Sequence, residues 1–342
     1  MIAYIVRRLL LLPVLLFGVS ILVFGLISLL TPYERVSLYV PEVSKREGGL
    51  EKSIKKYGLD RPLYEQYFRW LGQVLQGNLG FAKRGKQPVM DLIKHAFPAT
   101  AELAMWCIVP IILVGIWLGV LAAVHHNRPI DHVTRVFSIV GWSFPTFVFG
   151  LLMLMVFYAK LGWFMPGRLS DWASKIVLSA EFTQYTGMNT VDALLNGRLD
   201  IFLDALRHLV LPVLTLSYLS WALILRVTRS SMLEALRQDY VVTARAKGLR
   251  EEVVINKHAR PNAMIPVATI GGLMILSLAS GVVITETIFN YKGMGWWMAD
   301  AAIHLDIVTV LGFTLFNGVI LVLGNLVVDI IYVFLDPRVR LQ

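Results

Sequence analysis

Cysteine and charge are both scarce in this chain of 342 residues. The single cysteine, Cys107, has no partner for an intrachain disulfide and lies inside an apolar run, which predicts a packing role. Charged residues make up 16% of the chain and hydrophobic residues 56%, and the mean hydropathy is +0.65. Because the apolar residues form runs close to the ~20 residues that span a hydrocarbon core, the sequence predicts an all-α, polytopic membrane protein.

Catalytic motifs are missing as well. The chain has no H-E-x-x-H and no G-x-S-x-G sequence, so a membrane protease or lipase would lack its metal site or its nucleophile. The segment 80–87 nearly spells a phosphate-binding loop, but Gln87 stands where a hydroxyl would hold Mg²⁺. His125, His126 and His132 have no carboxylate or cysteine at metal-ligand spacing, which favours a solvated loop. We therefore expect no enzyme activity, no catalytic residue and no metal site.

The formal net charge of +9 raises two alternatives, nucleic acid and membrane lipid. In a chain this apolar, Lys and Arg ordinarily lie near anionic headgroups and on cytoplasmic loops. We therefore expect membrane lipids as partners and no nucleic acid.

Six apolar runs are long enough to be membrane spans, at 9–30, 100–124, 134–159, 207–228, 264–287 and 308–335. The first follows Arg7 and Arg8 and exceeds the apolar core of a secretory signal, so it predicts an uncleaved anchor with a cytoplasmic N-terminus. Segments 125–133, 229–263 and 336–342 then lie in the cytoplasm, and 31–99, 160–206 and 288–307 lie outside. Per residue, the inner segments are the more basic, as the positive-inside rule requires.

This topology divides the chain into two predicted regions. Residues 1–99 form an N-terminal anchor helix and a large extracytoplasmic loop, and residues 100–342 form a five-helix core. Five prolines inside the spans each remove an intrahelical hydrogen bond and favour a kink, which suits a bundle that opens and closes but is also tolerated without such a role. They are Pro13, Pro110, Pro145, Pro212 and Pro266.

The basic inner segment 229–263 contains helical signals of its own. No Gly or Pro interrupts Asp239 to Lys247, and Gly248 stands where a helix C-cap would fall. A second amphipathic turn, Glu251 to Arg260, is expected to end at Pro261. The segment is therefore predicted as a short helix, a turn and a second helix near the membrane surface.

The first of these helices carries small residues beside charges. Thr243 and Lys247 share one helix face, and Ala244 and Gly248 share a neighbouring one. A patch of small side chains permits close docking by another protein. The alternative is an amphipathic loop held by lipid phosphates.

Distinctive blocks of sequence occur in order along nearly the whole chain: Tyr57-Gly-Leu-Asp-Arg-Pro-Leu63 with Gln66-Tyr67, Gly77-Asn-Leu-Gly80, Pro98-Ala-Thr-Ala-Glu-Leu-Ala104, Asp239-Tyr-Val-Val-Thr-Ala-Arg-Ala-Lys-Gly-Leu249 with His258 and Asn262-Ala-x-x-Pro266, and Leu335-Asp-Pro-Arg338. Together they resemble the permease subunits of ABC importers of the peptide/nickel class. Each block alone is a weak signal, whereas several independent blocks in the correct order are specific.

The resemblance implies a six-helix permease with the type I ABC importer fold, in a prokaryotic plasma membrane with both termini in the cytoplasm. Such a chain pairs with a second, similar permease subunit, docks two cytoplasmic ATPase subunits and receives solute from an extracytoplasmic solute-binding protein. ATP and Mg²⁺ are then expected on the ATPase subunits, with no cofactor on this chain. The implied function is uptake of di- or oligopeptides. Oligosaccharide or nickel uptake, and a non-transporting membrane scaffold, are the alternatives.

The same resemblance makes 229–263 the coupling loop that seats against the ATPase subunits. The residues implied are Asp239, Tyr240, Thr243, Ala244, Ala246, Lys247, Gly248, Leu249, His258 and Asn262. The outer segment 171–206 is longer than is typical of the family, so it is either an insertion that helps to dock the binding protein or a neutral one. Two further departures, at 290–293 and 305–308, fall near the expected outer gate.

Pore or gate candidates follow from polar residues within or beside the last two spans. They are Ser280, Glu286, Asn325 and Asp329. Glu102, His208, Glu286 and Asp329 lie near the ends of apolar runs, where most are expected to reach water. A proton-coupled transporter would need a carboxylate near the membrane midplane, and none is evident, which disfavours that mechanism.

Overall fold

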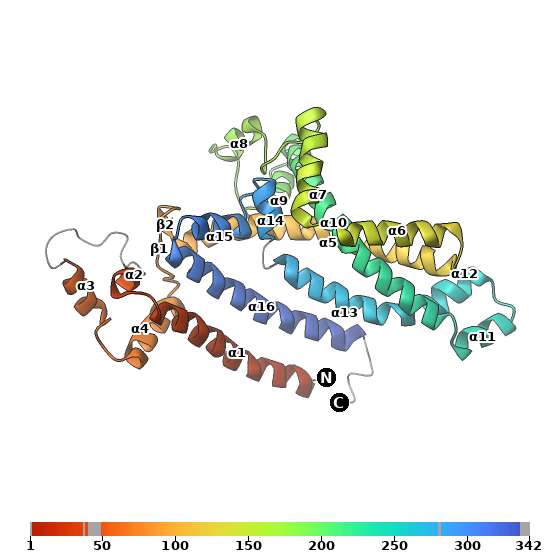
Figure 1. The fold of residues 1–342 in the computed structure, drawn as a ribbon, viewed down its shortest axis with the longest axis horizontal. Helices are drawn as coiled ribbons and strands as arrows, with labels where there is room; N and C mark the ends of the chain where they lie inside the picture. Colours follow the sequence, from red (N-terminus) through yellow and green to blue (C-terminus); the bar gives the residue numbers. More distant parts are fainter. Residues whose placement is uncertain (1, 37, 40–48, 280–281, 336–342) are drawn as a thin grey trace. The chain divides into compact units, whose positions relative to one another are not determined.

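The structure, a computed structural model, describes residues 2–36, 38–39, 49–279 and 282–335 (Figure 1). The predicted all-α class is confirmed, since β1 (Phe81–Ala82) and β2 (Gln87–Pro88) are the only strands in the described residues. The chain forms two compact units. One contains residues 1–100, 280–283 and 292–327, and the other contains residues 101–279, 284–291 and 328–342.

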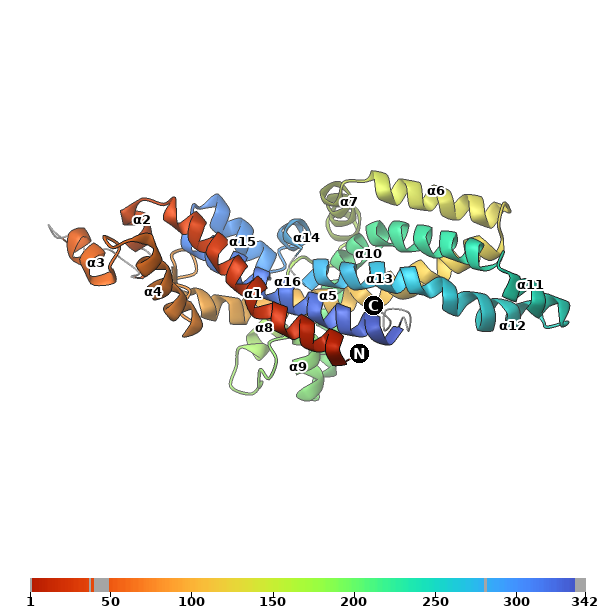
Figure 2. The same ribbon diagram turned by 90° about the horizontal axis from the view of Figure 1, so that it is seen from below.

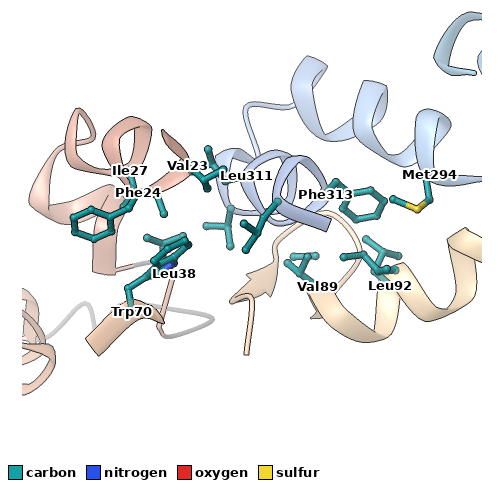
Figure 3. Close-up of a cluster of buried hydrophobic side chains, with 14 of the residues drawn as sticks. Val23, Phe24, Ile27, Leu38, Trp70, Val89, Leu92, Met294, Leu311 and Phe313 are labelled. Carbon is teal, nitrogen blue, oxygen red and sulfur yellow. The ribbon is translucent and has the colours of Figure 1, made fainter. Parts of the chain in front are cut away.

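The first unit is built from both ends of the chain. Its elements are α1 (Ile2–Ser28), α2 (Pro32–Val36), α3 (Gly49–Tyr57), α4 (Leu63–Leu75), the antiparallel β1–β2 hairpin, the start of α5 (Val89–Val124), α15 (Met294–Ile303) and most of α16 (Ile307–Leu335). Within its buried core α16 is central: Leu311 lies beside Val23 of α1, and Phe313 lies near Met294 and Leu92 (Figure 3). Gly318 brings α16 close to α1, because a Cβ there would lie 2.7 Å from Val19.

Polar contacts fix the β1–β2 hairpin of this unit against the start of α16. The backbone N–H of Arg84 donates to Asp306 at 3.1 Å, and the Arg84 side chain pairs with Asp300 of α15 at 3.3 Å. Asp306 also accepts a hydrogen bond from the Thr309 hydroxyl at 2.8 Å, within the first turn of α16. A carboxylate at this position complements the positive end of the helix dipole.

The second unit holds the remaining helices. They are the rest of α5, α6 (Pro129–Ser143), α7 (Thr146–Met153), the π-helix η1 (Leu154–Lys160), α8 (Asp171–Val177), α9 (Asn189–Leu195), α10 (Leu199–Ala235), α11 (Asp239–Ala246), α12 (Glu251–Val253), the π-helix η2 (Val254–Ala259), α13 (Arg260–Ala279) and most of α14 (Val283–Ile288). Helices α6, α10 and α13 lie side by side, with α10 in the middle (Figure 2). Gly272 of α13 packs closely on Val328, because a Cβ there would lie 2.8 Å from its Cγ1.

Helices α5 and α10 cross at unusually close range. A Cβ on Gly115 would lie 2.6 Å from Ile224, and a Cβ on Gly119 would lie 2.4 Å from the Cβ of Thr228. Ordinary carbon contacts are about 3.5–4.0 Å, so only glycine fits at either position. Two glycines four residues apart put the small positions on one face of α5, which lets the helix backbones approach.

The predicted spans are recovered in part. Four described helices are long and apolar enough to cross a membrane: α1, α5, α10 and α16. The third predicted span, 134–159, is not one continuous helix, because α6 and the α7–η1 helix meet at an angle of 101° (Figure 1). Pro145 stands at this bend, where it cannot donate the hydrogen bond that would continue α6. The predicted span 264–287 falls on α13 and α14, and residues 280–281 between them lie outside the described residues.

The outer segment 171–206 folds around a core of its own. Its buried residues are Ala173, Val177, Phe182, Ala193 and Ile201. Asp192 of α9 ties down the chain before that helix by accepting backbone hydrogen bonds from Thr186 at 2.8 Å and Gly187 at 2.9 Å. The segment is therefore an ordered helical element.

Candidate functional site

The turn after α11 has the geometry that the sequence predicts. Helix α11 covers Asp239–Ala246, Lys247 is its C-cap, and Gly248 follows with a φ of +74°. The Gly248 amide donates to the carbonyl of Arg245 at 2.9 Å. Because a Cβ on Gly248 would meet no atom within 4 Å, the need for glycine is set by the backbone alone.

Helix α11, the turn at Gly248 and the following α12 and η2 form a helical hairpin, residues 239–259, which we call the hairpin. Helix α11 is held on a buried cluster, which we call the hairpin core. It joins five helical elements, α5, α10, α11, η2 and α13, through Ala123, Met232, Ala235, Val241, Ala244, Val254, Ala259 and Ala263. Ala244 was expected on the docking surface, but the structure places it on the inward face, where it is 5% exposed. Small residues here let α11 pack closely on η2, so Ala244 supports the helix.

The opposite face of α11 is open. Val242 is 55% exposed, and Thr243, Ala246, Lys247 and Leu249 are exposed with it. Asp239 and Tyr240 are also exposed at the start of the helix. Large apolar side chains among small and charged ones on a rigid helix are typical of protein interaction surfaces. We call Val242, Thr243, Ala246, Lys247 and Leu249 the outer face of α11.

An ion pair closes the turn at Gly248. The guanidinium of Arg245 donates to both oxygens of Glu251, at 2.6 and 3.1 Å. This hydrogen bond holds the pKa of the Glu251 carboxyl below its usual value. This pair was not predicted from the sequence, although charges of opposite sign on either side of a helix-ending glycine were a signal for it. Both side chains are exposed, so the pair orders the turn more than it stabilises the fold.

The second helix of the hairpin does not end at Pro261. Helix α12, η2 and α13 follow one another without a break from Glu251 to Ala279, so this prediction is wrong. Pro261 is the second residue of α13 and lies inside this continuous run, directly after the π-helix η2, so its missing N–H falls where the regular α-helical hydrogen-bond pattern is already interrupted. Asn262 donates its side-chain N–H to the carbonyl of the half-buried His258 at 3.0 Å. These two predicted residues are therefore brought together.

A cleft of about 370 Å³ lies between the end of α10, the start of α11 and the start of α13. Its lining includes Tyr240 and Asn262 from the predicted set, together with Glu234 and Gln238. The two predicted residues thus meet beside a carboxylate that the sequence analysis did not select.

The structure describes the side chains of two of the four pore and gate candidates. Glu286 is 0% exposed, and Asn325 is half-buried on α16. Ser280 and the side chain of Asp329 lie outside the described residues. The four residues stay predictions.

Glu102 anchors a buried network that the sequence analysis missed. It was expected to reach water, but it is 1% exposed. One of its oxygens accepts from the backbone N–H and hydroxyl of Thr190 at 2.6 and 2.9 Å. The other accepts from Arg168 and from the hydroxyl of Tyr291, both at 2.8 Å. The carboxylate therefore ties α5 to the outer segment and to the chain after α14.

His208 is also buried, and it lies beside Ser170 and Asp204. These are the three residue types of a serine hydrolase triad. The Ser170 hydroxyl donates to Asp204 at 2.6 Å, and its backbone N–H donates to the same carboxylate at 2.8 Å. In a hydrolase the carboxylate would orient the histidine instead of accepting the serine proton. Here Asp204 fixes the chain before α8, so the cluster is structural. No group of three His, Cys, Asp or Glu in the described ranges is placed to hold a metal ion.

Long apolar helices with an exposed helical hairpin between α10 and α13 are typical of a membrane protein that contacts a partner outside the bilayer. The chain belongs to the family of binding-protein-dependent transport system inner membrane components, whose model matches residues 115–341. The model of the N-terminal part of these membrane components matches residues 1–104. The resemblance found in the sequence is thereby confirmed. The chain is a multi-pass inner-membrane permease subunit of a transporter complex, and such subunits are transporters and not catalysts.

Named relatives span the whole chain. It is 40% identical over 343 residues to the di/tripeptide transport system permease protein DppB of Pseudomonas aeruginosa (strain UCBPP-PA14), covering 100% of both chains. It is 40% identical over 324 residues to the probable D,D-dipeptide transport system permease protein DdpB of Escherichia coli (strain K12), covering 94% of this chain and 93% of the relative. It is 38% identical to the oligopeptide transport system permease protein AppB of Bacillus subtilis (strain 168), covering 99% and 100%.

Proposed function

We propose that this chain is one of two permease subunits of an ATP-driven importer of di- and oligopeptides. The names of the relatives, all of them peptide transport permeases, support the substrate class. The second permease subunit is a similar chain, and a solute-binding protein delivers the peptide from outside the cell. Both termini of this chain then lie in the cytoplasm, on the same side as the hairpin.

The outer face of α11 carries the coupling role in this proposal. It presents Val242 and Ala246 on α11, which the hairpin core holds in place, and Leu249 just after the turn at Gly248. A groove on a cytoplasmic ATPase subunit would cover this apolar surface. ATP and Mg²⁺ bind on the two ATPase subunits, and this chain binds no cofactor. Closure of the ATPase pair then moves the permease helices as rigid bodies between inward-facing and outward-facing states.

Transport in reconstituted vesicles tests the proposal. The complete complex, with its binding protein outside, should accumulate labelled di- and tripeptides only when ATP is supplied to the ATPase side. Uptake of an oligosaccharide or of nickel in place of peptide would overturn the substrate class. An intact complex that imports none of the three would overturn the transport function in favour of a membrane scaffold.

The coupling role has its own matched pair of variants. Gly248→Val should abolish uptake, because a β-branched residue at positive φ costs roughly 1–2 kcal/mol and distorts the docking turn. Gly197→Val is the control, since Gly197 also follows a helix C-cap, has a φ of +68° and meets nothing within 4 Å of a Cβ. Equal uptake by the two variants would contradict the coupling role of the turn.

A further inference from the structure

A buried carboxylate lies at the start of α6, away from the outer face of α11. Asp131 is 0% exposed and accepts two hydrogen bonds from Arg229 of α10, at 2.7 Å to Oδ1 and 2.9 Å to Oδ2. The backbone N–H of Asn127, in the turn after α5, donates to Oδ2 at 3.0 Å. Bidentate pairs of this kind fix orientation as well as distance. Asp131 therefore locks the start of α6 to α10 and to the turn after α5.

Arg229 is rigidly connected to the hairpin. It lies in the last two turns of α10, which ends at Ala235. The next turn carries Met232 and Ala235, which are buried in the hairpin core against Val241 of α11. Because α10 is continuous between these residues, a displacement of α11 is transmitted along it to the Arg229 guanidinium.

Helix α6 is attached to α10 along most of its length, with Gly141 against Tyr218 and Trp142 beside the guanidinium of Arg226 towards its far end. Near its middle, Phe137 packs edge-on against Tyr218 of α10, with ring centroids 4.9 Å apart. At its start, the attachment is the Asp131–Arg229 pair. Each aromatic pair contributes only modestly, whereas two charge-assisted hydrogen bonds to a buried carboxylate are stronger and also fix orientation. The far end of α6 bends by 101° into α7.

We propose that the Asp131–Arg229 pair is the joint through which movement of the hairpin reaches the bent α6–α7 helices during transport. This inference rests on the coupling role of the hairpin proposed for this chain. The two residues are positioning residues, which contact neither solute nor nucleotide. Asp131 and Arg229 keep α6 moving together with α10 when the ATPase subunits close.

The groups around the pair explain why each partner is needed. His126 Nδ1 lies 3.5 Å from Asp131 Oδ2 and 3.2 Å from an Arg229 nitrogen. Arg135, on the next turn of α6, places its Nε 3.6 Å from Asp131 Oδ1. Asp131 is therefore the acceptor around which three basic side chains gather. Arg229→Lys would keep the charge but lose the two-point contact, because an ammonium lacks the planar fork of a guanidinium.

The test compares Arg229→Lys and Asp131→Asn with the unmodified complex in proteoliposomes, with the binding protein present. We expect hydrolysis of ATP, stimulated by loaded binding protein, to continue while peptide uptake per ATP falls about tenfold, the size of a modest coupling between sites. Arg198→Lys is the matched control, because Arg198 makes an exposed two-point pair with Asp200 at the other end of α10. The Arg198→Lys variant should leave the ratio of peptide uptake to ATP hydrolysis unchanged. Uptake and hydrolysis that fall together in the Arg229 and Asp131 variants, or do not fall, would overturn the proposal.

A second readout does not depend on which solute is carried. Hydrogen exchange of the assembled complex, with and without a non-hydrolysable ATP analogue, should change in both the hairpin and α6–α7 of the unmodified protein. In Arg229→Lys the hairpin should still respond, and the response of α6–α7 should weaken, because Phe149 of α7 keeps its stacking contact with Tyr218 of α10. A response of α6–α7 that is unchanged in this variant would overturn the joint. A hairpin that never responds to nucleotide, even in the unmodified complex, would instead overturn the coupling role proposed for it.

Discussion

Replacing Gly119 with alanine tests whether α5 and α10 approach as closely as the structure shows. The added Cβ would lie 2.4 Å from the Cβ of Thr228, 2.8 Å from its Cγ2 and 2.9 Å from the carbonyl oxygen of Leu225. Ordinary contacts are about 3.5–4.0 Å, so the helices would have to separate by roughly 1 Å. Neighbouring contacts, such as that between Gly115 and Ile224, would then lose about a quarter to a half of their attraction.

The loss of stability in Gly119→Ala can be estimated by comparison with a glycine that has free space around it. Overpacking a close contact costs about 1–3 kcal/mol, whereas alanine gains about 1 kcal/mol over glycine in a helix. Gly18 of α1 meets nothing within 4 Å of a Cβ, so Gly18→Ala gains the helix term alone. The difference between the two variants therefore isolates the steric term, and Gly119→Ala should be the less stable by about 1–3 kcal/mol.

Thermal denaturation of the purified protein in nanodiscs, followed by tryptophan fluorescence, measures this difference. A second substitution, Thr228→Gly in the Gly119→Ala protein, should restore part of the loss, because it removes the two Thr228 contacts and leaves the contact with the Leu225 carbonyl. Equal melting temperatures for Gly119→Ala and Gly18→Ala would refute the close approach of the helices.

Three other predictions concern single groups. Because the folded-state pKa of Glu251 is lowered, the stabilisation from its ion pair is complete above the ordinary pKa of 4.5 and is lost as pH falls through the folded-state pKa. Spin labels at Thr243 and Val253 should therefore show a broader distance distribution in acid. Glu251→Gln should remove this pH dependence. Glu102→Ala should lower the free energy of unfolding by about 3 kcal/mol, the lower end for a broken buried pair since its arginine partner is partly exposed; an unchanged melting temperature would contradict the network. Cys107 is fully buried, so a maleimide should label it only after denaturation, and rapid labelling of the folded protein would contradict its place in the core.

Local signals in the sequence were sufficient for α11 and its turn. A helix without Gly or Pro from Asp239 onward, ended by Gly248, is specified by interactions between residues at most a few positions apart. The apolar runs gave the long helices for the same reason, because their length and composition are local properties. The angle of the bend near Pro145 could not be predicted from the sequence, since proline permits a kink without setting its angle.

Contacts between distant segments could not be predicted in this way. The partners of Glu102 lie 66, 88 and 189 residues along the chain, and no periodic pattern links such positions. The inward orientation of Ala244 was missed because small residues suit both a buried helix contact and a docking surface. Asp131 and Arg229, 98 residues apart, each resemble an ordinary charge near a helix end until the fold brings them together.

The hairpin core also bears on how force would pass through the molecule. Ala123 at the end of α5, Met232 near the end of α10 and Ala263 at the start of α13 all belong to this one cluster beneath α11. If the outer face of α11 docks an ATPase subunit as proposed, its displacement moves three long helices together, because close-packed cores transmit strain and do not absorb it. Substitutions that enlarge a core alanine, such as Ala244→Leu, should therefore uncouple transport although Ala244 is covered by its own chain. A complex with Ala244→Leu that imports peptide with unchanged efficiency would show that α11 moves independently of the helices beneath it.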